Sequence, residues 1–505
     1  MNDTPVTIQF ALISHTNNGK TTLARTLVGM DVGEVRDAAH VTVLAEEHTL
    51  LRTEQGDTLQ LWDTPGFGDS VRLLRRLAMA GNPIGWFLRE VFDRYRDKPF
   101  WLSQQALRTA RDSADVVLYL VNSSELPRDA GYLPAEMKIL EWLGKPVVVL
   151  LNQLGPPRPA NEEHAEQAQW KQHLDQFAIV RDVLALDAFA RCWIHERVFY
   201  EAVGKLLDET KRDGYARLLA LWQANNQHRF QQAMHVTASQ LVAAAQGSEP
   251  IQIVDTGFLQ TAMKAVGLSK SADQQRQEKA MALLIERLNV NLGETTRSLL
   301  KLHQLDPGDA AKINSRLREN FKVRAPVDKA QAGLLGAVVS GAATGLSADL
   351  MAGGLTFGAG ALLGGVVGAL TMAGAAWGFN THTDRNKSTV EFADEFLQTL
   401  LVGSVLRYLA VAHFGRGRGN FVEGEAPAFW QAEVEAAVSL HGAALDGLWQ
   451  SLRTEADPDK AAARIEPVVT AITSYALARL YPDAPPVAAD PTGQLPAQDV
   501  TPVPN

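Results

Sequence analysis

Residues 6–28 read VTIQFALISHTNNGKTTLARTLV, and this stretch decides the fold of the first part of the chain. It begins with an apolar run, 6–13, that is typical of a buried β-strand, and helical periodicity follows the loop after it. The loop ends in Gly19-Lys20-Thr21. A loop between a strand and a helix N-terminus can wrap its backbone N–H groups around phosphates. The stretch therefore predicts a phosphate-binding loop, or P-loop.

The chemistry of phosphate binding gives the loop residues distinct roles. Lys20 would reach the outer phosphates, and the hydroxyl of Thr21 would bind Mg2+. The first position of the usual GxxxxGK[ST] pattern is Ser14 here, and so small a side chain fits with modest strain. The predicted nucleotide-binding residues of this part of the chain are Ser14, Asn17, Asn18, Gly19, Lys20, Thr21 and Thr22.

A second motif supports the first. The short apolar strand 59–62 ends in Asp63-Thr64-Pro65-Gly66. Asp63 would hold Mg2+ through water at a strand end, and the N–H of Gly66 would contact the terminal phosphate. Thr42 stands between the two motifs, where a switch threonine would complete the magnesium shell. The predicted catalytic residues are Lys20, Thr42 and Gly66, and the predicted magnesium ligands are Thr21, Thr42 and Asp63.

These motifs resemble those of the Era-like GTPases, which belong to the translation-factor-related class of P-loop proteins. The resemblance rests on 14–22, Thr42 and 63–66, and it covers residues 1–200. It implies an α/β domain that binds GTP and GDP and, with Mg2+ as cofactor, hydrolyses GTP to GDP and phosphate.

The same resemblance locates the residues that read the base. The family motif Asn-Lys-x-Asp corresponds to Asn152-Gln153-Leu154-Gly155, so the aspartate that pairs with guanine is missing. Asn152 is expected to keep its bridge to the P-loop, but loss of the carboxylate weakens discrimination between bases. Asp187 is an alternative base contact after the sixth strand of the family fold. Guanine specificity is thus implied by the resemblance alone, and adenine stays open.

Phe67 follows Gly66, where Ras-like enzymes have a glutamine that orients the attacking water. Hydrolysis must therefore be arranged in another way. Asn17 resembles the P-loop asparagine of potassium-activated GTPases, which implies a K+ site and nucleotide-dependent self-association; the alternative is that Asn17 only shapes the loop. Phe67 and the missing aspartate also leave open a nucleotide-binding scaffold that hydrolyses little.

Strand-like and helical stretches alternate through residues 1–200, and this alternation predicts a mostly parallel sheet flanked by helices. The expected strands are 6–13, 59–62, 116–121, 147–151 and 179–186. A helical insertion, 70–111, carries arginines between Leu, Trp and Phe. Its basic face either packs on the domain or contacts a partner or a membrane.

The chain of 505 residues is too long for one core, and the part after the GTPase-like domain predicts an all-α C-terminal region. The expected parts are a helical domain, a Gly-rich hydrophobic helical hairpin, C-terminal helices that pack with the helical domain, and a disordered tail. They span 201–330, 331–381, 382–481 and 482–505.

The Gly-rich segment stands out by composition. The range 333–378 holds 13 of the 39 glycines, and 350–381 contains no Asp, Glu, Lys or Arg. Such a length can cross a bilayer, and the GxxxG spacing lets helices approach closely in lipid. Because Gly and Ala contribute little transfer energy, a hairpin packed inside the helical domain is an equal alternative to a membrane contact through 332–380.

The whole chain also resembles a bacterial group in which an Era-like GTPase domain is fused to an uncharacterised helical C-terminal domain with such a Gly-rich stretch. The segments that carry this resemblance are 186–193, 348–356 and 413–419. This resemblance supplies no cellular task. The leading hypothesis is a nucleotide-switched hydrolase that controls a helical, membrane-associated effector domain. The alternative by analogy with Era, a ribosome or RNA assembly factor, has no recognisable RNA-binding module here.

Composition limits the partners and the compartment. The net charge of −9 gives no general drive toward nucleic acid, so no nucleic-acid partner is expected. The single cysteine, Cys192, excludes an intramolecular disulfide and fits a reducing compartment. Residues 1–5 lack the pattern of a secretory signal. The protein is expected in the cytoplasm, where it would be either free, peripheral to the inner membrane or inserted in it.

Overall fold

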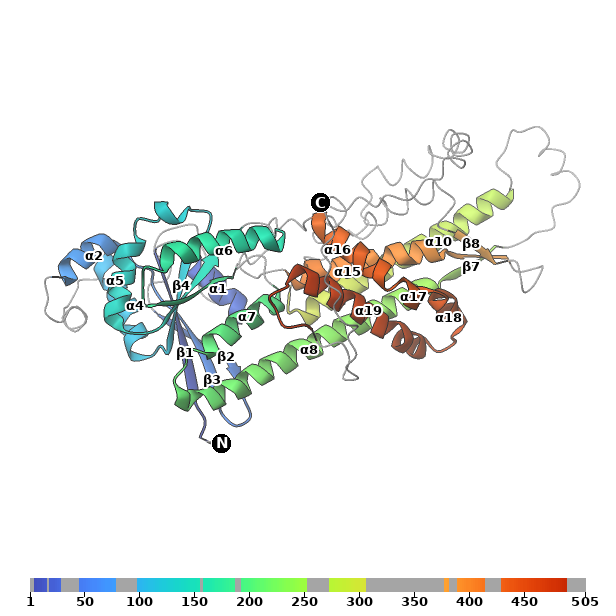
Figure 1. Ribbon diagram of the computed structural model, residues 1–505. Helices are drawn as coiled ribbons and strands as arrows, with labels where there is room; N and C mark the ends of the chain where they lie inside the picture. Colours follow the sequence, from blue (N-terminus) through green and yellow to red (C-terminus); the bar gives the residue numbers. More distant parts are fainter. Residues whose placement is uncertain are drawn as a thin grey trace, which may run out of the picture. The chain divides into compact units, whose positions relative to one another are not determined.

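A computed structural model of the chain describes residues 4–15, 18–28, 45–78, 98–154, 158–186, 192–251, 272–305, 377–380, 388–413 and 428–487 (Figure 1). The chain divides into two compact units. The first comprises 1–228 with 412–427 and 480–485, and the second comprises 229–411, 428–479 and 486–505.

The described part of the first unit contains a six-stranded sheet in the order β2-β3-β1-β4-β5-β6. All neighbours are parallel except β2 and β3, which are antiparallel. The prediction of an α/β domain with a mostly parallel sheet is therefore confirmed. The strands are β1 (Thr7–Ser14), β2 (Glu46–Arg52), β3 (Thr58–Asp63), β4 (Val116–Asn122), β5 (Val147–Asn152) and β6 (Val180–Ala185).

The edge strand β2 was not among the expected strands. Its sequence, EEHTLLR, lacks an apolar run, and its side chains are exposed or half-buried. A strand at the edge of a sheet can carry polar residues because one side of it faces solvent. The alternation of apolar residues on which the prediction relied is absent for that reason.

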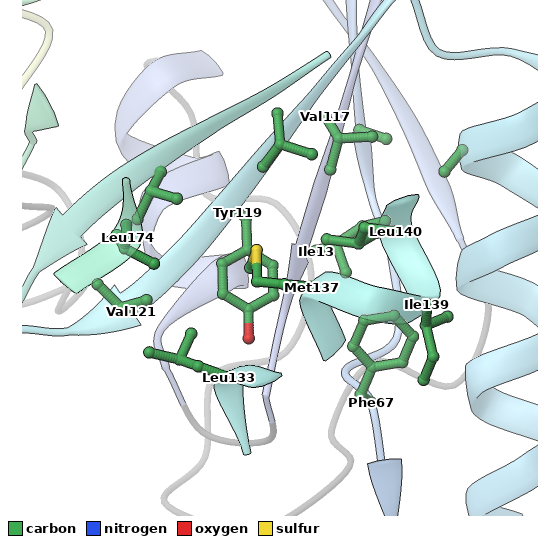
Figure 2. Packing of buried hydrophobic residues seen from close by; sticks show 14 of the residues in the cluster. Ile13, Phe67, Val117, Tyr119, Val121, Leu133, Met137, Ile139, Leu140 and Leu174 are labelled. Carbon is green, nitrogen blue, oxygen red and sulfur yellow. The ribbon is translucent and has the colours of Figure 1, made fainter. Parts of the chain in front are cut away.

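Helices cover both faces of the sheet, and the central strands β4 and β5 are accordingly apolar up to the asparagine that ends each of them. The helices are α1 (Lys20–Val28), α2 (Ser70–Leu77), α4 (Lys98–Asp112), α5 (Leu133–Leu143), α6 (Ala160–Leu174) and α7 (Trp193–Gly204). Successive residues of β4 enter opposite cores: Val117 and Tyr119 pack with α5 on one face, whereas Val116 and Leu118 pack on the other. Figure 2 shows Met137 and Leu140 of α5 against Val117 and Tyr119.

The expected insertion 70–111 contains α2 and α4, and residues 79–97 between them lie outside the described part. Asp69 caps α2 by accepting a hydrogen bond from the N–H of Arg72 over 3.0 Å. The guanidinium carbons of Arg72 and Arg76 lie 4.8 Å and 5.6 Å from the ring centre of Phe100 on α4. Cation–π contacts of this kind account for part of the interleaved arginines and aromatics.

The second unit is mainly helical, as predicted for the C-terminal region. Its helices are α10 (Ala272–Leu302), α15 (Asp394–Ala412), α16 (Ala428–Leu440), α17 (Gly442–Leu445), α18 (Leu448–Thr454) and α19 (Pro458–Leu480), together with the later part of α8 (Glu209–Ala245). It also contains a small antiparallel sheet, β7-β9-β8, that the sequence did not predict. These strands, β7 (Ser248–Ile251), β8 (Trp377–Asn380) and β9 (Ser388–Phe392), are too short to give a periodic signal.

The Gly-rich segment 331–381 lies outside the described residues except for β8 at its end, and so does the loop 415–419. Among the described residues, one helix, α15, is long and apolar enough to cross a membrane. However, 67% of its apolar window is buried within the structure. A core helix of a folded domain meets the same criterion, so α15 gives only weak support to a membrane span.

Candidate nucleotide site

The predicted site residues stand where parallel strands end. Ser14 ends β1, Asp63 ends β3 and Asn152 ends β5. Because the carboxyl ends of parallel strands share one edge of the sheet, these residues gather around the loop between β1 and α1. Helix α1 begins at Lys20, so the free N–H groups of its first turn face the same edge.

Gly19 has a conformation and a neighbour that only glycine tolerates. Its φ is +83°, in the left-handed region. A Cβ at this position would lie 2.6 Å from Nδ2 of Asn152. The glycine of the predicted motif therefore serves both the turn and the close packing of the P-loop against β5.

Lys20 is buried, with 8% of its surface exposed, and its Nζ donates a hydrogen bond to Oγ of Ser14 over 3.0 Å. Burial lowers the pKa of Lys20, while the negative charges of Asp63 and Glu136 oppose that shift. The serine that replaces the usual glycine thus supplies an oxygen for the lysine. The Oγ of Ser14 in turn donates to the carbonyl of His15.

Thr21 and Asp63 form the strongest candidate for a metal site. Oγ1 of Thr21 donates to Oδ2 of Asp63 over 2.7 Å. Asp63 is 1% exposed, and its Oδ1 has no hydrogen-bond partner among the described residues. Burial raises the pKa of Asp63, while the Thr21 hydrogen bond and the Lys20 charge lower it. A hydroxyl beside a carboxylate with a free oxygen fits Mg2+, which prefers oxygen ligands.

Asn152 links the base motif to the P-loop. Its Nδ2 donates to the carbonyl of Asn18 over 2.9 Å, and Nδ2 of Asn18 donates to the carbonyl of Leu120 over 3.1 Å. Gln153, the next residue, has a φ of +62°. The loop after β5 therefore turns sharply directly beside the P-loop.

The DxxG segment packs tightly against β1. Oγ1 of Thr64 donates to the carbonyl of Leu12 over 2.5 Å, and the N–H of Phe67 donates to the carbonyl of Ser14 over 2.9 Å. Gly66 is buried between them. The ring of Phe67 is fully buried in the hydrophobic cluster that also contains Met137 and Ile139 of α5 (Figure 2), and a phenyl ring has no group that could hydrogen-bond to a water.

The structure therefore brings Ser14, Asn18, Gly19, Lys20, Thr21, Asp63 and Asn152 together, with Thr22 on the same first turn of α1 and Gly66 after β3. Three predicted site residues, Asn17, Thr42 and Asp187, lie outside the described residues. Their roles stay predictions.

A buried carboxylate beside the P-loop was missed by the sequence reasoning. Glu136 on α5 is fully buried; its Oε1 lies 2.7 Å from Nδ1 of His15, and its Oε2 accepts from the hydroxyl of Tyr119 over 2.5 Å. The His15 ring stacks on Tyr132, with ring centres 4.3 Å apart. An acidic residue among the apolar positions of α5 was the only signal available. Glu136 ties the P-loop to α5.

Similarity to a known protein family agrees with this geometry. The family described as 50S ribosome-binding GTPase matches residues 9–153. The N-terminal domain is therefore a GTP-binding P-loop GTPase domain. No curated protein matched the chain significantly.

Solved structures that match part of the chain include Era in complex with MgGDPNP and nucleotides of 16S ribosomal RNA, at 18% identity, with 41% of this chain and 58% of that chain covered and a TM-score of 0.31. An Aquifex aeolicus Era variant bound to GDP·AlF4− is 14% identical, with 57% and 88% covered and a TM-score of 0.31. Toc33 from Arabidopsis thaliana is 16% identical, with 37% and 72% covered and a TM-score of 0.24. The chain thus spans little more than half the length of the first of these, and matches with TM-scores this low support no conclusion about this chain.

A second family match covers 171–467, more than half of the chain, and it is described as domain of unknown function DUF3482. The chain therefore belongs to the DUF3482 family and carries a P-loop GTPase domain before the DUF3482 domain.

Proposed function

We propose that the chain is a Mg2+-dependent GTPase whose nucleotide state controls its second, mainly helical unit, called the helical unit below. The observation that carries the proposal is the Thr21–Asp63 pair, with one oxygen of Asp63 left over, beside the buried ammonium of Lys20. Hydrolysis of a nucleoside triphosphate needs positive charge and N–H donors around the transferred phosphoryl group rather than a covalent group of the protein. The P-loop supplies both.

In this proposal each residue has a defined task. Thr21, Thr42 and Asp63 would hold Mg2+, Asp63 through water, and the metal would supply charge neutralisation at the outer phosphates. Lys20 contacts the same phosphates, and Gly66 donates its N–H to the terminal one. Asn152 keeps the P-loop in place through Asn18.

Orientation of the attacking water falls to another group, because Phe67 is buried. We propose that K+ bound at Asn17, with self-association through the nucleotide face, accelerates hydrolysis by adding positive charge at the phosphates, as an arginine finger does. The base contact missing from 152–155 is assigned to Asp187 in the same proposal. Weak discrimination between guanine and adenine would follow if that assignment fails.

Release of phosphate from GTP and from ATP, in K+ and in Na+, tests this function, with Lys20→Ala as the blank. GTP turnover that Lys20→Ala abolishes is expected, and it should be faster in K+. Equal turnover in the two salts would contradict only the proposed K+ site and leave the GTPase activity standing. Equal turnover of ATP would contradict only the guanine specificity. An unchanged rate in Lys20→Ala would contradict the hydrolase.

The second candidate is a nucleotide-binding scaffold that hydrolyses little, and the burial of Phe67 favours it. Saturable binding of GTP without phosphate release, lost in Lys20→Ala, would select this candidate. The two functions share a binding site and differ only in turnover.

The helical unit is the proposed effector, and its proposed contact is a membrane surface through 332–380. Flotation of the purified chain with liposomes, with GTP or with GDP, tests this part separately. RNA binding belongs to the Era complex named above; the net charge of −9 gives no reason to include an RNA partner here.

A further inference from the structure

Arg407 on α15 is a buried cation in the helical unit. Only 2% of its surface is exposed, and neither Nε nor Nη1 has a hydrogen-bond acceptor among the described residues. Burial lowers the pKa of Arg407 to about 10, and no described carboxylate offsets that shift. The guanidinium therefore still carries its charge near neutral pH.

A second unpartnered donor faces the same helix. Gln240 on α8 is 1% exposed, and its Oε1 lies 2.8 Å from Oγ of Ser404 on α15. Its Nε2 has no partner among the described residues. Residues three apart share a helix face, so Ser404 and Arg407 both belong to the side of α15 that meets α8. On this side, Nε and Nη1 of Arg407 and Nε2 of Gln240 therefore have no acceptor within the described part of the chain.

Buried charges in proteins are normally paired, because removing an ion from water costs free energy that only an opposite charge and hydrogen bonds return. The described residues around Arg407 thus offer neither a negative charge nor acceptor oxygens for its Nε and Nη1. The planar fork of a guanidinium matches the two oxygens of a carboxylate or a phosphate. We propose that Arg407, together with Gln240, forms a binding site in the helical unit for a small oxyanion, a carboxylate or phosphate group.

This site is distinct from the nucleotide site, which lies in the other unit, and the proposal goes beyond the GTPase function. Direct binding tests it, with the full chain and two probes, inorganic phosphate and acetate. Because phosphate can also enter the P-loop, all titrations are made in the Lys20→Ala background. Calorimetry at constant ionic strength gives the affinity of each probe.

Saturable binding of at least one probe is expected, and Arg407→Met should weaken it about 30-fold or more, as for loss of one partner of a buried charge pair. Arg407→Lys keeps the positive charge but loses the planar guanidinium, and it should also weaken binding of the probe. This second variant keeps the proposal testable if Arg407→Met does not fold. Arg464→Met, at an exposed arginine of the same unit, is the matched control and should bind normally. The probe that binds with the higher affinity shows whether the ligand carries a phosphate or a carboxylate group.

Thermal unfolding without added oxyanion gives an independent readout. Because an unpaired buried charge is destabilising, Arg407→Met should then unfold at a higher temperature than the parent, and added ligand should reverse this order. Binding of neither probe, or equal binding by Arg407→Met and the parent, would overturn the proposal. A lower unfolding temperature of Arg407→Met together with no binding would show that the chain itself neutralises Arg407.

Discussion

Thr21, at the start of α1, and Asp63, at the end of β3, are joined by a hydrogen bond of 2.7 Å between Oγ1 and Oδ2. The two residues come from the two motifs that the sequence analysis singled out, 42 residues apart. The bond brings a hydroxyl and a buried carboxylate to one point at the edge of the sheet. Metal affinity should depend on that pair.

Asp63→Asn removes the negative charge and keeps an oxygen for Thr21. We expect the affinity for Mg2+ in the nucleotide complex to fall about 10- to 100-fold, the usual loss for a carboxylate that holds a metal through its water shell. Titration of Mg2+ against a fluorescent GTP analogue measures this. Asp112→Asn, at an exposed carboxylate, is the control. An unchanged Mg2+ dependence would place the metal elsewhere.

Gly19→Ala puts a Cβ at a φ of +83°, 2.6 Å from Nδ2 of Asn152. We expect nucleotide binding to be lost, and the free energy of unfolding to fall by about 1–2 kcal/mol because of the left-handed backbone. Gly131→Ala is the matched control, since nothing lies within 4 Å of its Cβ position. If both variants bind GTP like the parent, the close packing at Gly19 has no functional role.

Glu136→Ala leaves the buried hydroxyl of Tyr119 without its acceptor and removes the anchor of His15. We expect the free energy of unfolding to fall by about 2–4 kcal/mol, from an unpartnered hydroxyl and a small cavity. Urea denaturation measures it. Glu141→Ala, on the exposed side of the same helix, should change it by less than about 0.5 kcal/mol. Equal effects of the two variants would contradict the anchor.

Asp57 predicts a dependence of stability on pH. Hydrogen bonds from Arg217, at 2.7 Å and 2.8 Å, lower the pKa of Asp57. A carboxyl with a lowered folded pKa stabilises the protein above its unfolded pKa, about 3.9 for Asp, and this stability is lost as pH falls through the folded pKa. The parent should therefore lose stability below about pH 4 more steeply than Asp57→Asn.

Urea unfolding of the parent and of Asp57→Asn between neutral and acid pH measures this difference. Asp129→Asn, at an exposed carboxylate, should follow the parent. A constant gap between the parent and Asp57→Asn at every pH would mean that the Arg217 contact is not electrostatic.

By itself the sequence determined the nucleotide-binding class of the first domain. Residues 14–22 and 63–66 are local motifs, and the strands before them are continuous apolar runs. Because parallel strands place their carboxyl ends at one edge, the order strand, motif, helix was enough to predict that Lys20, Thr21 and Asp63 meet. The mainly helical character of the later part followed equally from local periodicity.

Only the tertiary structure decided which polar groups are buried and what they contact. Glu136 reaches His15 across 121 residues of chain, Arg217 reaches Asp57 across 160, and Gln240 reaches Ser404 across 164. No local pattern encodes such pairs. The sequence around a charged residue on a helix can be the same whether its side chain contacts solvent, a charged partner or the core. The edge strand β2 and the sheet β7-β9-β8 escaped prediction for a related reason: their stability comes from hydrogen bonds to strands elsewhere in the chain rather than from their own periodicity.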